Sequence, residues 1–579
     1  MDPLAPTALA ISNDFMGRLG NSFSLIRDHG KKVQKYVMKN KKFDILSRKS
    51  WKSVVNVVLV EAKDLPDGPT NGSNGLYCKF KLGTETYKSK QVSKSKSMWC
   101  ERFNMYLYDE SSLETTVWYK GKQKNFMGRC SIDISRLERE KTHDLWLELE
   151  CGYGSLHLLV TVSGSTRFPP ADGIPTTNSI HQTTLEKEEF SWYKLDNMNE
   201  VGQLLVTVHG AKGLSALGIS GKADPYCVLE LDNSRVQTHT VNATNDPIWN
   251  KTYFFGVNDI TSILDITVYD ESIINSLKGE TLGKLSIPLL RIKNEEKRWY
   301  ALKDRSKKSG AKGNCPRILL EMSVVWNPIK ASLRVLSPKE KKYTQKPPKF
   351  NIPLIYNNLK FIRDIFNALY LANEHFKRAF EWENKELCVA GLGVWVSFWY
   401  FFQLWMAPLI LLLPFIYYWT GQRCYNSNAL ILVNQSDDEQ SDDELENSKD
   451  EKTLKTRIYG MQDLTFTIKN GIDYIVSLIE RFKNLANFTV PYLSYLAILV
   501  LLAIAAIIYL VPVNYLLMAL GIYKFMRKFL TPERVPNNDI LDFLSRVPDN
   551  EMLKQWRELK VPEPNISRSN SKKKLMITE

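Results

Sequence analysis

The chain has 579 residues, more than a single hydrophobic core usually contains, so we expect several domains. Apolar residues make up 44% of the sequence and charged residues 24%, and this balance excludes a mostly disordered chain. The 77 Lys and Arg residues outnumber the 63 Asp and Glu residues, and the resulting charge of +14 indicates anionic partners such as lipid head groups or nucleic acid. The eight cysteines form no Cys-x-x-Cys pair, which excludes a disulfide scaffold and a zinc site, and we expect most to be buried thiols.

Residues 1–50 form a basic N-terminal segment. Four apolar residues between Phe15 and Ile26 would share one face of a helix, and six lysines follow them. Glycines at positions 17, 20 and 30 weaken that helix. We therefore expect this segment to be partly disordered.

Residues 51–326 contain short β-branched runs separated by Gly, Asn, Asp and Pro, a pattern typical of an all-β sandwich. The pattern occurs twice, because Tyr77 matches Tyr226, Trp99 matches Trp249, and Trp118 matches Tyr269, at offsets of 149, 150 and 151 residues. A slowly drifting offset indicates a duplicated domain, with copies at residues 51–165 and 201–326. Residues 166–200 between them are rich in Pro, Gly, Ser and Thr, which predicts a linker.

Three motifs mark the second copy. Asp-Pro-Tyr at residues 224–226 opens a strand, Pro-x-Trp-Asn spans residues 247–250, and Val-Tyr-Asp ends at Asp270. Together they resemble a C2 domain, an eight-stranded antiparallel β-sandwich whose loops at one end bind calcium and anionic lipid. The resemblance implies a mostly β fold for both copies.

The same resemblance implies an incomplete calcium site. Asp224, Asp270 and Glu280 match acidic positions of C2 domains, whereas Gly218 and Ser272 stand where further acids are expected. Calcium takes six to eight oxygen ligands, and its affinity follows the number of charged ones. Calcium is therefore an uncertain cofactor, and the alternative is that Asp224 caps a turn and Asp270 is an ordinary loop residue.

The first copy has lost the acids and gained lysines. Tyr119, Gly121 and Asn125 stand where acids are expected, so this copy should not bind calcium. Alternation along the predicted strands places Lys79 and Lys81 on one sheet face, and it likewise places Lys88 and Lys90 on one face. If the strands pair, these four lysines would bind the phosphate of a lipid head group. The alternative is an ordinary solvated strand face.

Residues 327–386 form a basic region ahead of the first hydrophobic segment. Nine Lys and Arg residues lie between positions 330 and 363, against Glu340 alone. Such a segment is attracted to an anionic leaflet. Because no nucleic-acid-binding fold signature accompanies it, we expect no nucleic acid partner.

Two uncharged hydrophobic segments follow, at residues 387–419 and 490–523. Both exceed the length of about 20 residues that crosses a bilayer, so we expect an α-helical membrane region. Pro408 and Pro414 should interrupt the first segment and Pro512 the second. The intervening residues 420–489 contain an acidic run and an amphipathic stretch from Ile458 to Phe482.

Two topologies remain open for these segments. Each could cross the membrane once, or each could be a re-entrant hairpin that returns to the side it came from. Basic residues on both outer flanks predict that the β-rich domains and the tail at 524–579 are cytosolic. Residues 434–436 form an Asn-Gln-Ser glycosylation sequon in the intervening loop. A glycan on Asn434 would place this loop on the lumenal side of the membrane.

Tandem C2 domains followed by two C-terminal hydrophobic segments resemble the family of multiple C2 and transmembrane domain proteins. The stretches EREKTHDLWLEL, IKASLRVLSPKEKKY, TVPYLSYLAI and NNDILDFLSRVP share the resemblance. It implies an integral membrane protein of the endoplasmic reticulum with cytosolic C2 domains and a reticulon-like membrane region. The family usually carries three C2 domains, and this chain has room for two.

We expect a non-enzymatic protein that binds anionic phospholipid, including phosphoinositides, in membrane trafficking, tethering or shaping. The sequence has no Gly-x-Ser-x-Gly, no Gly-rich phosphate loop and no His-Glu-x-x-His motif. Self-association through the membrane segments is a further expectation. The alternative is a reticulon-like curvature protein whose degenerate C2 domains bind proteins.

Overall fold

The computed structural model describes residues 51–65, 75–93, 96–108, 111–120, 124–150, 154–164, 190–196, 200–215, 221–271, 280–307, 309–344, 352–380, 385–426, 451–530 and 538–561. The basic N-terminal segment, most of the predicted linker and residues 427–450 of the acidic loop lie outside the described residues. The chain divides into two compact units, the first comprising residues 1–138 and 144–168 and the second comprising residues 139–143 and 169–579.

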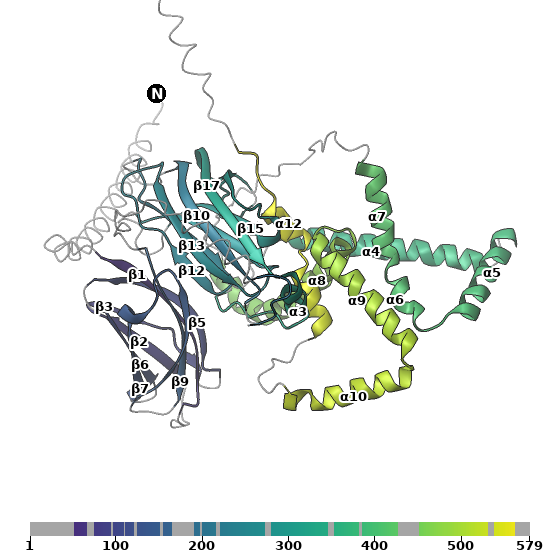
Figure 1. Cartoon of the computed structure of the whole chain (residues 1–579), viewed down its shortest axis with the longest axis horizontal. Helices are drawn as coiled ribbons and strands as arrows, with labels where there is room; N and C mark the ends of the chain where they lie inside the picture. Colours follow the sequence, from purple (N-terminus) through teal and green to yellow (C-terminus); the bar gives the residue numbers. More distant parts are fainter. Residues whose placement is uncertain are drawn as a thin grey trace, which may run out of the picture. The chain divides into compact units, whose positions relative to one another are not determined.

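The first sandwich consists of two sheets, with strand orders β5-β1-β9-β8 and β3-β2-β6-β7, and β4 pairs with β2 (Figure 1). Its elements are β1 (Ser53–Lys63), β2 (Gly75–Leu82), β3 (Glu85–Lys88), β4 (Val92–Ser93), β5 (Met98–Leu107), β6 (Ser112–Lys120), β7 (Lys124–Asp133), the 3-10 helix η1 (Ile134–Arg136), β8 (Thr142–Glu148) and β9 (Ser155–Ser163). The core draws on both sheets, with Val57 and Leu158 from one and Phe80 and Val117 from the other.

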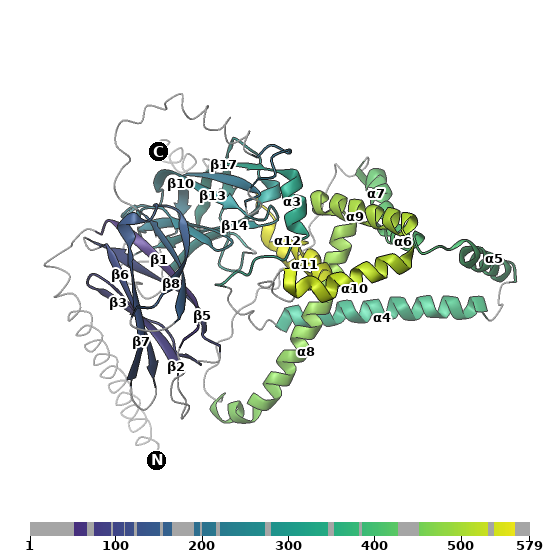
Figure 2. The same cartoon turned by 60° about the horizontal axis from the view of Figure 1, so that its bottom comes forward.

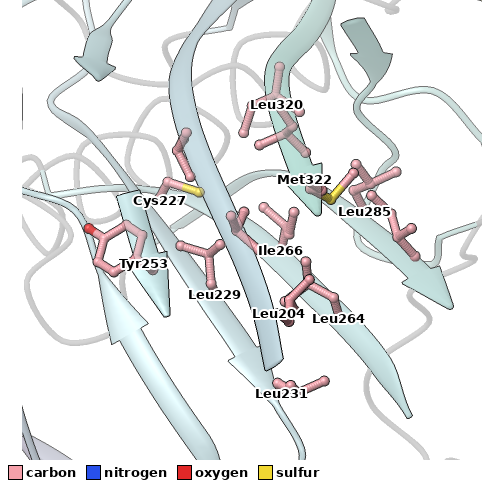
Figure 3. Packing of buried hydrophobic residues seen from close by; sticks show 14 of the residues in the cluster. Leu204, Cys227, Leu229, Leu231, Tyr253, Leu264, Ile266, Leu285, Leu320 and Met322 are labelled. Carbon is pink, nitrogen blue, oxygen red and sulfur yellow. The ribbon is translucent and has the colours of Figure 1, made fainter. Parts of the chain in front are cut away.

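The second sandwich has the strand orders β13-β10-β17-β16 and β12-β11-β14-β15. Its elements are β10 (Gly202–Leu214), β11 (Pro225–Leu231), β12 (Ser234–Gln237), β13 (Ile248–Val257), β14 (Ile263–Asp270), β15 (Glu280–Pro288), the 3-10 helix η3 (Leu289–Arg291), β16 (Glu296–Ala301) and β17 (Gly313–Trp326). Apolar side chains from both sheets, among them Leu204, Ile266 and Leu320, form its core (Figure 3). The β-sandwich fold expected for both copies is confirmed.

The remainder of the second unit is helical, as expected for the C-terminal region (Figure 2). The helices are α3 (Pro328–Val335), α4 (Ile352–Phe380), α5 (Lys385–Phe401), α6 (Met406–Ile410), α7 (Leu413–Asn426), α8 (Glu451–Ala486), α9 (Pro491–Leu510), α10 (Val513–Leu530), α11 (Asp539–Arg546) and α12 (Asn550–Trp556).

Each hydrophobic segment is divided between helices. Among the described residues, Pro491–Leu510 is the one helix long and apolar enough to cross a membrane, and the other apolar stretches are shorter. Pro512 separates α9 from α10, as expected. The first segment is interrupted at residues 402–405 and again at residues 411–412. Pro408 and Pro414 lie in the first turns of α6 and α7, which begin after these interruptions and where a helix tolerates proline.

A third apolar core joins helices that are far apart in the sequence. Its buried members are Val335 of α3, Leu412, Phe415 of α7, Leu485 of α8, Leu493 and Leu496 of α9, and Val547 after α11. Polar contacts strengthen the same region: the Asn484 amide donates to the carbonyl of Pro548 at 2.9 Å, and Ser477 donates to Asp549 at 3.0 Å. Chain stretches before, between and after the hydrophobic segments therefore meet in one place.

Arg546 attaches this helical cluster to the second sandwich. Its side chain is fully buried, and its Nε donates to Asp259 Oδ2 at 2.9 Å in the loop between β13 and β14. The two terminal nitrogens donate to Asp542 and to the carbonyls of Arg334, Val335 and Ser337. Five acceptors thus match the five N–H groups of a guanidinium.

The charge of Asp259 responds to this contact. Burial by itself would raise the pKa of its carboxyl, but the Arg546 guanidinium and the hydrogen bonds from Thr261 outweigh burial and hold it below its usual value. A lowered carboxylate pKa stabilises the folded state above the unfolded pKa, and that contribution is lost as the pH falls through the folded pKa. The attachment is therefore fully charged at neutral pH.

Replacing Arg546 by Met should release α11 and α12 from the second sandwich. The variant Arg546→Met leaves Asp259 buried without a counter-ion, which typically costs about 3–5 kcal/mol. Hydrogen exchange of the full-length chain should show faster exchange of amides in α11 and α12. The exposed Arg557 provides the control: Arg557→Met should leave exchange unchanged, and equal exchange in the two variants would contradict the role of Arg546.

Candidate functional site

The outer face of the sheet containing β2 and β3 carries two lysines directly opposite each other. Along β2, Cys78, Phe80 and Leu82 point into the core, so Lys79 and Lys81 are exposed. The register of the β2–β3 pair places Lys79 opposite Lys88. Like charges directly across a strand pair repel each other, so this arrangement favours an anion between them.

Aromatic rings hold these two ammonium groups in place without neutralising them. Lys79 Nζ lies 5.2 Å from the centroid of the Trp118 ring, and Lys88 Nζ lies 4.4 Å from that of Tyr77. A cation–π contact orients a lysine and leaves its full positive charge. Within the described residues, neither lysine forms an ion pair with an acid.

The other two predicted lysines are differently placed. Lys81 Nζ lies 3.6 Å from Glu114 Oε2 on β6. Lys90 follows the end of β3, and its Nζ lies 4.0 Å from Glu101 Oε1. The structure therefore brings Lys79 and Lys88 together, whereas Lys81 and Lys90 each contact an acid that sequence alternation does not identify.

Arg129 extends the cationic face and was missed in the sequence. Thr116 of β6 pairs with both Lys79 of β2 and Arg129 of β7, so Lys88, Lys79 and Arg129 lie in one row across the sheet. Arg129 is exposed, and its Nε lies 3.4 Å from Glu150. Alternation along the strand would have identified it, because Arg129 and Cys130 are neighbours on opposite faces, with Arg129 exposed and Cys130 buried.

The three positions of the first sandwich that lack the expected acids lie in different surroundings. Tyr119 is buried in the core. Asn125 is partly buried on β7, opposite Tyr119. Gly121 lies outside the described residues. The cationic row, defined as Lys79, Lys88 and Arg129, is the functional candidate of this domain. Lys79 and Lys88 are its principal members, because Arg129, like Lys81 and Lys90, contacts an acid.

In the second sandwich, the three predicted acidic residues lie at one end of neighbouring strands. Asp224 immediately precedes β11, Asp270 ends β14 and Glu280 begins β15. The register pairs Asp270 with Pro225 on one side and with Glu280 on the other. Gly218 and Ser272, where C2 domains have further acids, lie outside the described residues.

Two of these carboxylates already stabilise the loops around them. Asp270 is buried, and its Oδ1 accepts the backbone N–H of Asp224 at 2.9 Å. Asp224 Oδ1 accepts the N–H of Ala243 at 2.6 Å. Glu271, which sequence comparison did not single out, accepts a hydrogen bond from the Thr240 hydroxyl.

The described residues contain only part of the acidic loops, because residues 216–220 and 272–279 lie outside them. Calcium needs six to eight oxygen ligands. Asp270 and Asp224 each use one carboxylate oxygen to accept a backbone N–H. Across the part of the chain that the structure describes, no group of three or more His, Cys, Asp or Glu side chains is arranged to hold a metal. The hydrogen bonds give Asp224 and Asp270 a structural role, and each involves only the Oδ1 atom of its carboxylate.

The cysteine side chains that the structure describes are buried or partly buried. Cys78, Cys130, Cys227 and Cys388 are buried, as predicted for most thiols, and Cys100 and Cys315 are partly buried. Burial raises the pKa of the Cys130 thiol to about 11, so it stays protonated at neutral pH.

The C2 domain family model matches residues 53–149 and 202–302. The chain is therefore a protein with two C2 domains. A Drosophila melanogaster protein named multiple C2 and transmembrane domain-containing protein is 39% identical over 535 residues, covering 92% of this chain and 58% of the relative. The Mus musculus multiple C2 and transmembrane domain-containing protein 1 is 37% identical over 581 residues, covering 95% of this chain and 58% of the relative. The chain belongs to the family of multiple C2 and transmembrane domain-containing proteins and spans less than two thirds of these relatives' length.

Among solved structures, a pair of C2 domains from extended synaptotagmin 2 matches 48% of this chain and 91% of that chain, at 21% identity and a TM-score of 0.20. That score carries no argument about function.

Removing the Asp270 carboxylate should loosen the β11–β14 end of the second sandwich whether or not calcium is present. Asp270→Ala leaves the Asp224 N–H without its acceptor, which typically costs about 1–3 kcal/mol. Hydrogen exchange of peptides from β11 and β14 should therefore accelerate equally in calcium and in chelator. Asp270→Asn retains an acceptor oxygen and is the matched control. An effect of Asp270→Ala that appears only in calcium would instead make Asp270 a metal ligand.

Proposed function

We propose that the first C2 domain binds anionic phospholipid head groups through Lys79, Lys88 and Arg129, without calcium. The supporting observation is the direct pairing of Lys79 with Lys88, two lysines held by aromatic rings rather than by acids. A phosphate between their ammonium groups relieves their repulsion and forms charge-assisted hydrogen bonds. Phosphoinositides, which carry several phosphates, suit a row of three cations best. The chemistry is association, and no bond-making step is assigned.

We further propose that the chain is anchored in the endoplasmic reticulum membrane by residues 387–523 and links that membrane to an anionic one. The relatives' name includes the word transmembrane, which supports the anchor. In the second C2 domain, β14 runs from Ile263, next to the loop that binds Arg546, to Asp270 in the acidic loops. Eight residues at about 3.3 Å each separate the two ends by roughly 25 Å. The acidic loops therefore lie away from the helices that precede and follow the membrane segments.

The proposed topology is that of two re-entrant hairpins. Asn484 before the second hydrophobic segment donates a hydrogen bond to Pro548 after it, and Arg546 donates to Val335, which precedes the first segment. A hydrogen-bonded cluster cannot extend across a bilayer of about 40 Å, which supports a return of each segment to the side it left. The breaks at residues 402–405 and at Pro512 give each segment a place to turn back, although α9 (Pro491–Leu510) is by itself long enough to cross a membrane.

Vesicle binding by the first C2 domain tests the lipid function. A fragment of residues 45–168 should sediment with vesicles containing phosphoinositide, equally in calcium and in chelator, and release at high salt. At about 1 kcal/mol per cation near an anionic surface, Lys79→Gln with Lys88→Gln should weaken binding about 30-fold.

The matched control removes the same charge from the lysines that contact acids. Lys81→Gln with Lys90→Gln should weaken binding about threefold or less, because Glu114 and Glu101 already offset those charges. Equal losses in the two double variants would mean that only net charge matters. Absence of binding to every vesicle would favour the alternative, a membrane-shaping protein whose C2 domains bind proteins.

Glycosylation of Asn434 tests the topology. In cells the full-length chain should remain unmodified at this sequon, because two hairpins leave the loop on the cytosolic side. The same loop, residues 420–489, placed behind a secretory signal peptide should acquire the glycan, which shows that the sequon is usable. A glycan on the full-length chain would contradict the hairpins.

A further inference from the structure

Helix α4 exposes a row of large apolar side chains to solvent. It is a 29-residue helix, and Phe366 and Tyr370 are 66% and 71% exposed. The large apolar residues that α4 exposes are Leu359, Phe366, Leu369, Tyr370, Leu371 and Phe376, and all but Leu371 form this row. The spacings of 7, 3, 1 and 6 residues within the row place its members on one side of a helix with 3.6 residues per turn. An apolar side that is exposed along several turns indicates a missing partner.

The opposite side of α4 is polar. Lys360, Asn367, Glu374 and Arg378 follow at intervals of 7, 7 and 4 residues, and Arg378 forms an ion pair with Glu374 at 2.7 Å. Leu371 falls on this polar side, and Asn373 and Lys377 fall on the apolar side, so the division is incomplete. A mainly apolar side and a mainly polar side are the pattern of helices that lie in the surface of a membrane. The positive charge of residues 327–386 does not by itself indicate this helix.

The described chain leaves the apolar side of α4 uncovered. Near its start α4 contacts α8, where the Asn358 amide donates to Asp473 Oδ1 at 2.6 Å. The residues from Phe366 to Phe376 lie two or more turns further along and remain largely exposed. Packing within this chain therefore does not explain the apolar row.

The position of α4 in the chain identifies the partner as lipid. It ends at Phe380, and α5, the start of the first hydrophobic segment, begins at Lys385. The five residue steps from Phe380 to Lys385 span at most about 18 Å, so, given the proposed anchoring of residues 387–523 in a membrane, the end of α4 lies close to the surface of that membrane. Lys377 and Arg378 in its last turn carry the charge that anionic head groups attract.

We propose that α4 lies in the plane of the membrane that contains α5, with Leu359, Phe366, Leu369, Tyr370 and Phe376 among the acyl chains and Lys360, Asn367 and Arg378 facing water. At 1.5 Å per residue, 29 residues occupy about 43 Å of a single leaflet. This inserted helix adds area to the leaflet on the side of the second C2 domain. It thereby supplies a membrane-shaping element that acts independently of head-group binding by the first C2 domain.

Fluorescence from two adjacent positions tests the proposal in the full-length chain. An environment-sensitive NBD probe is attached to Leu369→Cys or to the matched control Asn367→Cys, with the other accessible cysteines replaced by serine. The protein is reconstituted into vesicles of phosphatidylcholine and phosphatidylserine. At position 369 the emission should shift to the blue, and lipids that carry a doxyl group near the head of the acyl chain should quench it at least threefold more than at position 367.

Each other outcome overturns the proposal in a recognisable way. Quenching by aqueous iodide at both positions would show that α4 stays in solvent. Protection of position 369 from iodide without quenching by doxyl lipid would show that a protein surface covers the apolar row. Equal doxyl quenching at both positions would show that lipid surrounds the whole helix. Because the measurement does not involve the first C2 domain, its result is separate from the vesicle-binding test.

Discussion

The buried guanidinium of Arg546 is the interaction on which the rest of this architecture depends. A buried guanidinium is tolerated only when its N–H groups have acceptors, and here they come from α3, α11 and the β13–β14 loop. Satisfying them requires these three elements to stay together. The second C2 domain, the chain ahead of the first hydrophobic segment and the chain after the second segment therefore form one structural unit.

This constraint determines how the membrane segments can run. With both of their outer ends bound to one C2 domain, and with Asn484 between them bound to Pro548, the proposed hairpin topology lets each segment start and finish on the same side. The break at Pro512 and the break after Phe401 allow the chain to turn back. The amphipathic helix α4 then lies where the chain first meets the membrane, and the acidic loops of the second C2 domain lie at the far end of that domain.

The sequence predicted what depends on local pattern. Duplicated motifs identified two β-sandwiches, and strand alternation placed Lys79 outside and Phe80 inside. Alternation does not give the register between strands, which is why the pairing of Lys79 with Lys88 and the partners of Lys81 and Lys90 emerged only from the structure. Motif matching located Asp224 and Asp270 correctly at neighbouring strand ends, but it could not show that their oxygens accept backbone N–H groups.

Longer-range features were beyond sequence reasoning. Asp259 and Arg546 are 287 residues apart, and nothing local to either residue indicates the other. The prolines of the first hydrophobic segment suggested breaks within its helices, whereas the structure places them near helix starts, since a proline lacks only the N–H that a first turn does not use. The number of basic residues in α4 does not predict its amphipathic character, because that character depends on the face of the helix on which each residue lies.

The distance between the second C2 domain and the tail of the membrane-embedded protein tests the account most directly. Spin labels at the exposed positions Lys293→Cys and Arg557→Cys flank a contact in which the Arg291 guanidinium lies 5.9 Å from the centroid of the Trp556 ring. Pulsed electron paramagnetic resonance on the full-length chain in lipid bilayers should give one narrow distance distribution, well below the bilayer thickness of about 40 Å. A broad distribution, or a mean distance greater than that thickness, would contradict the attachment of the tail and the hairpin topology that follows from it.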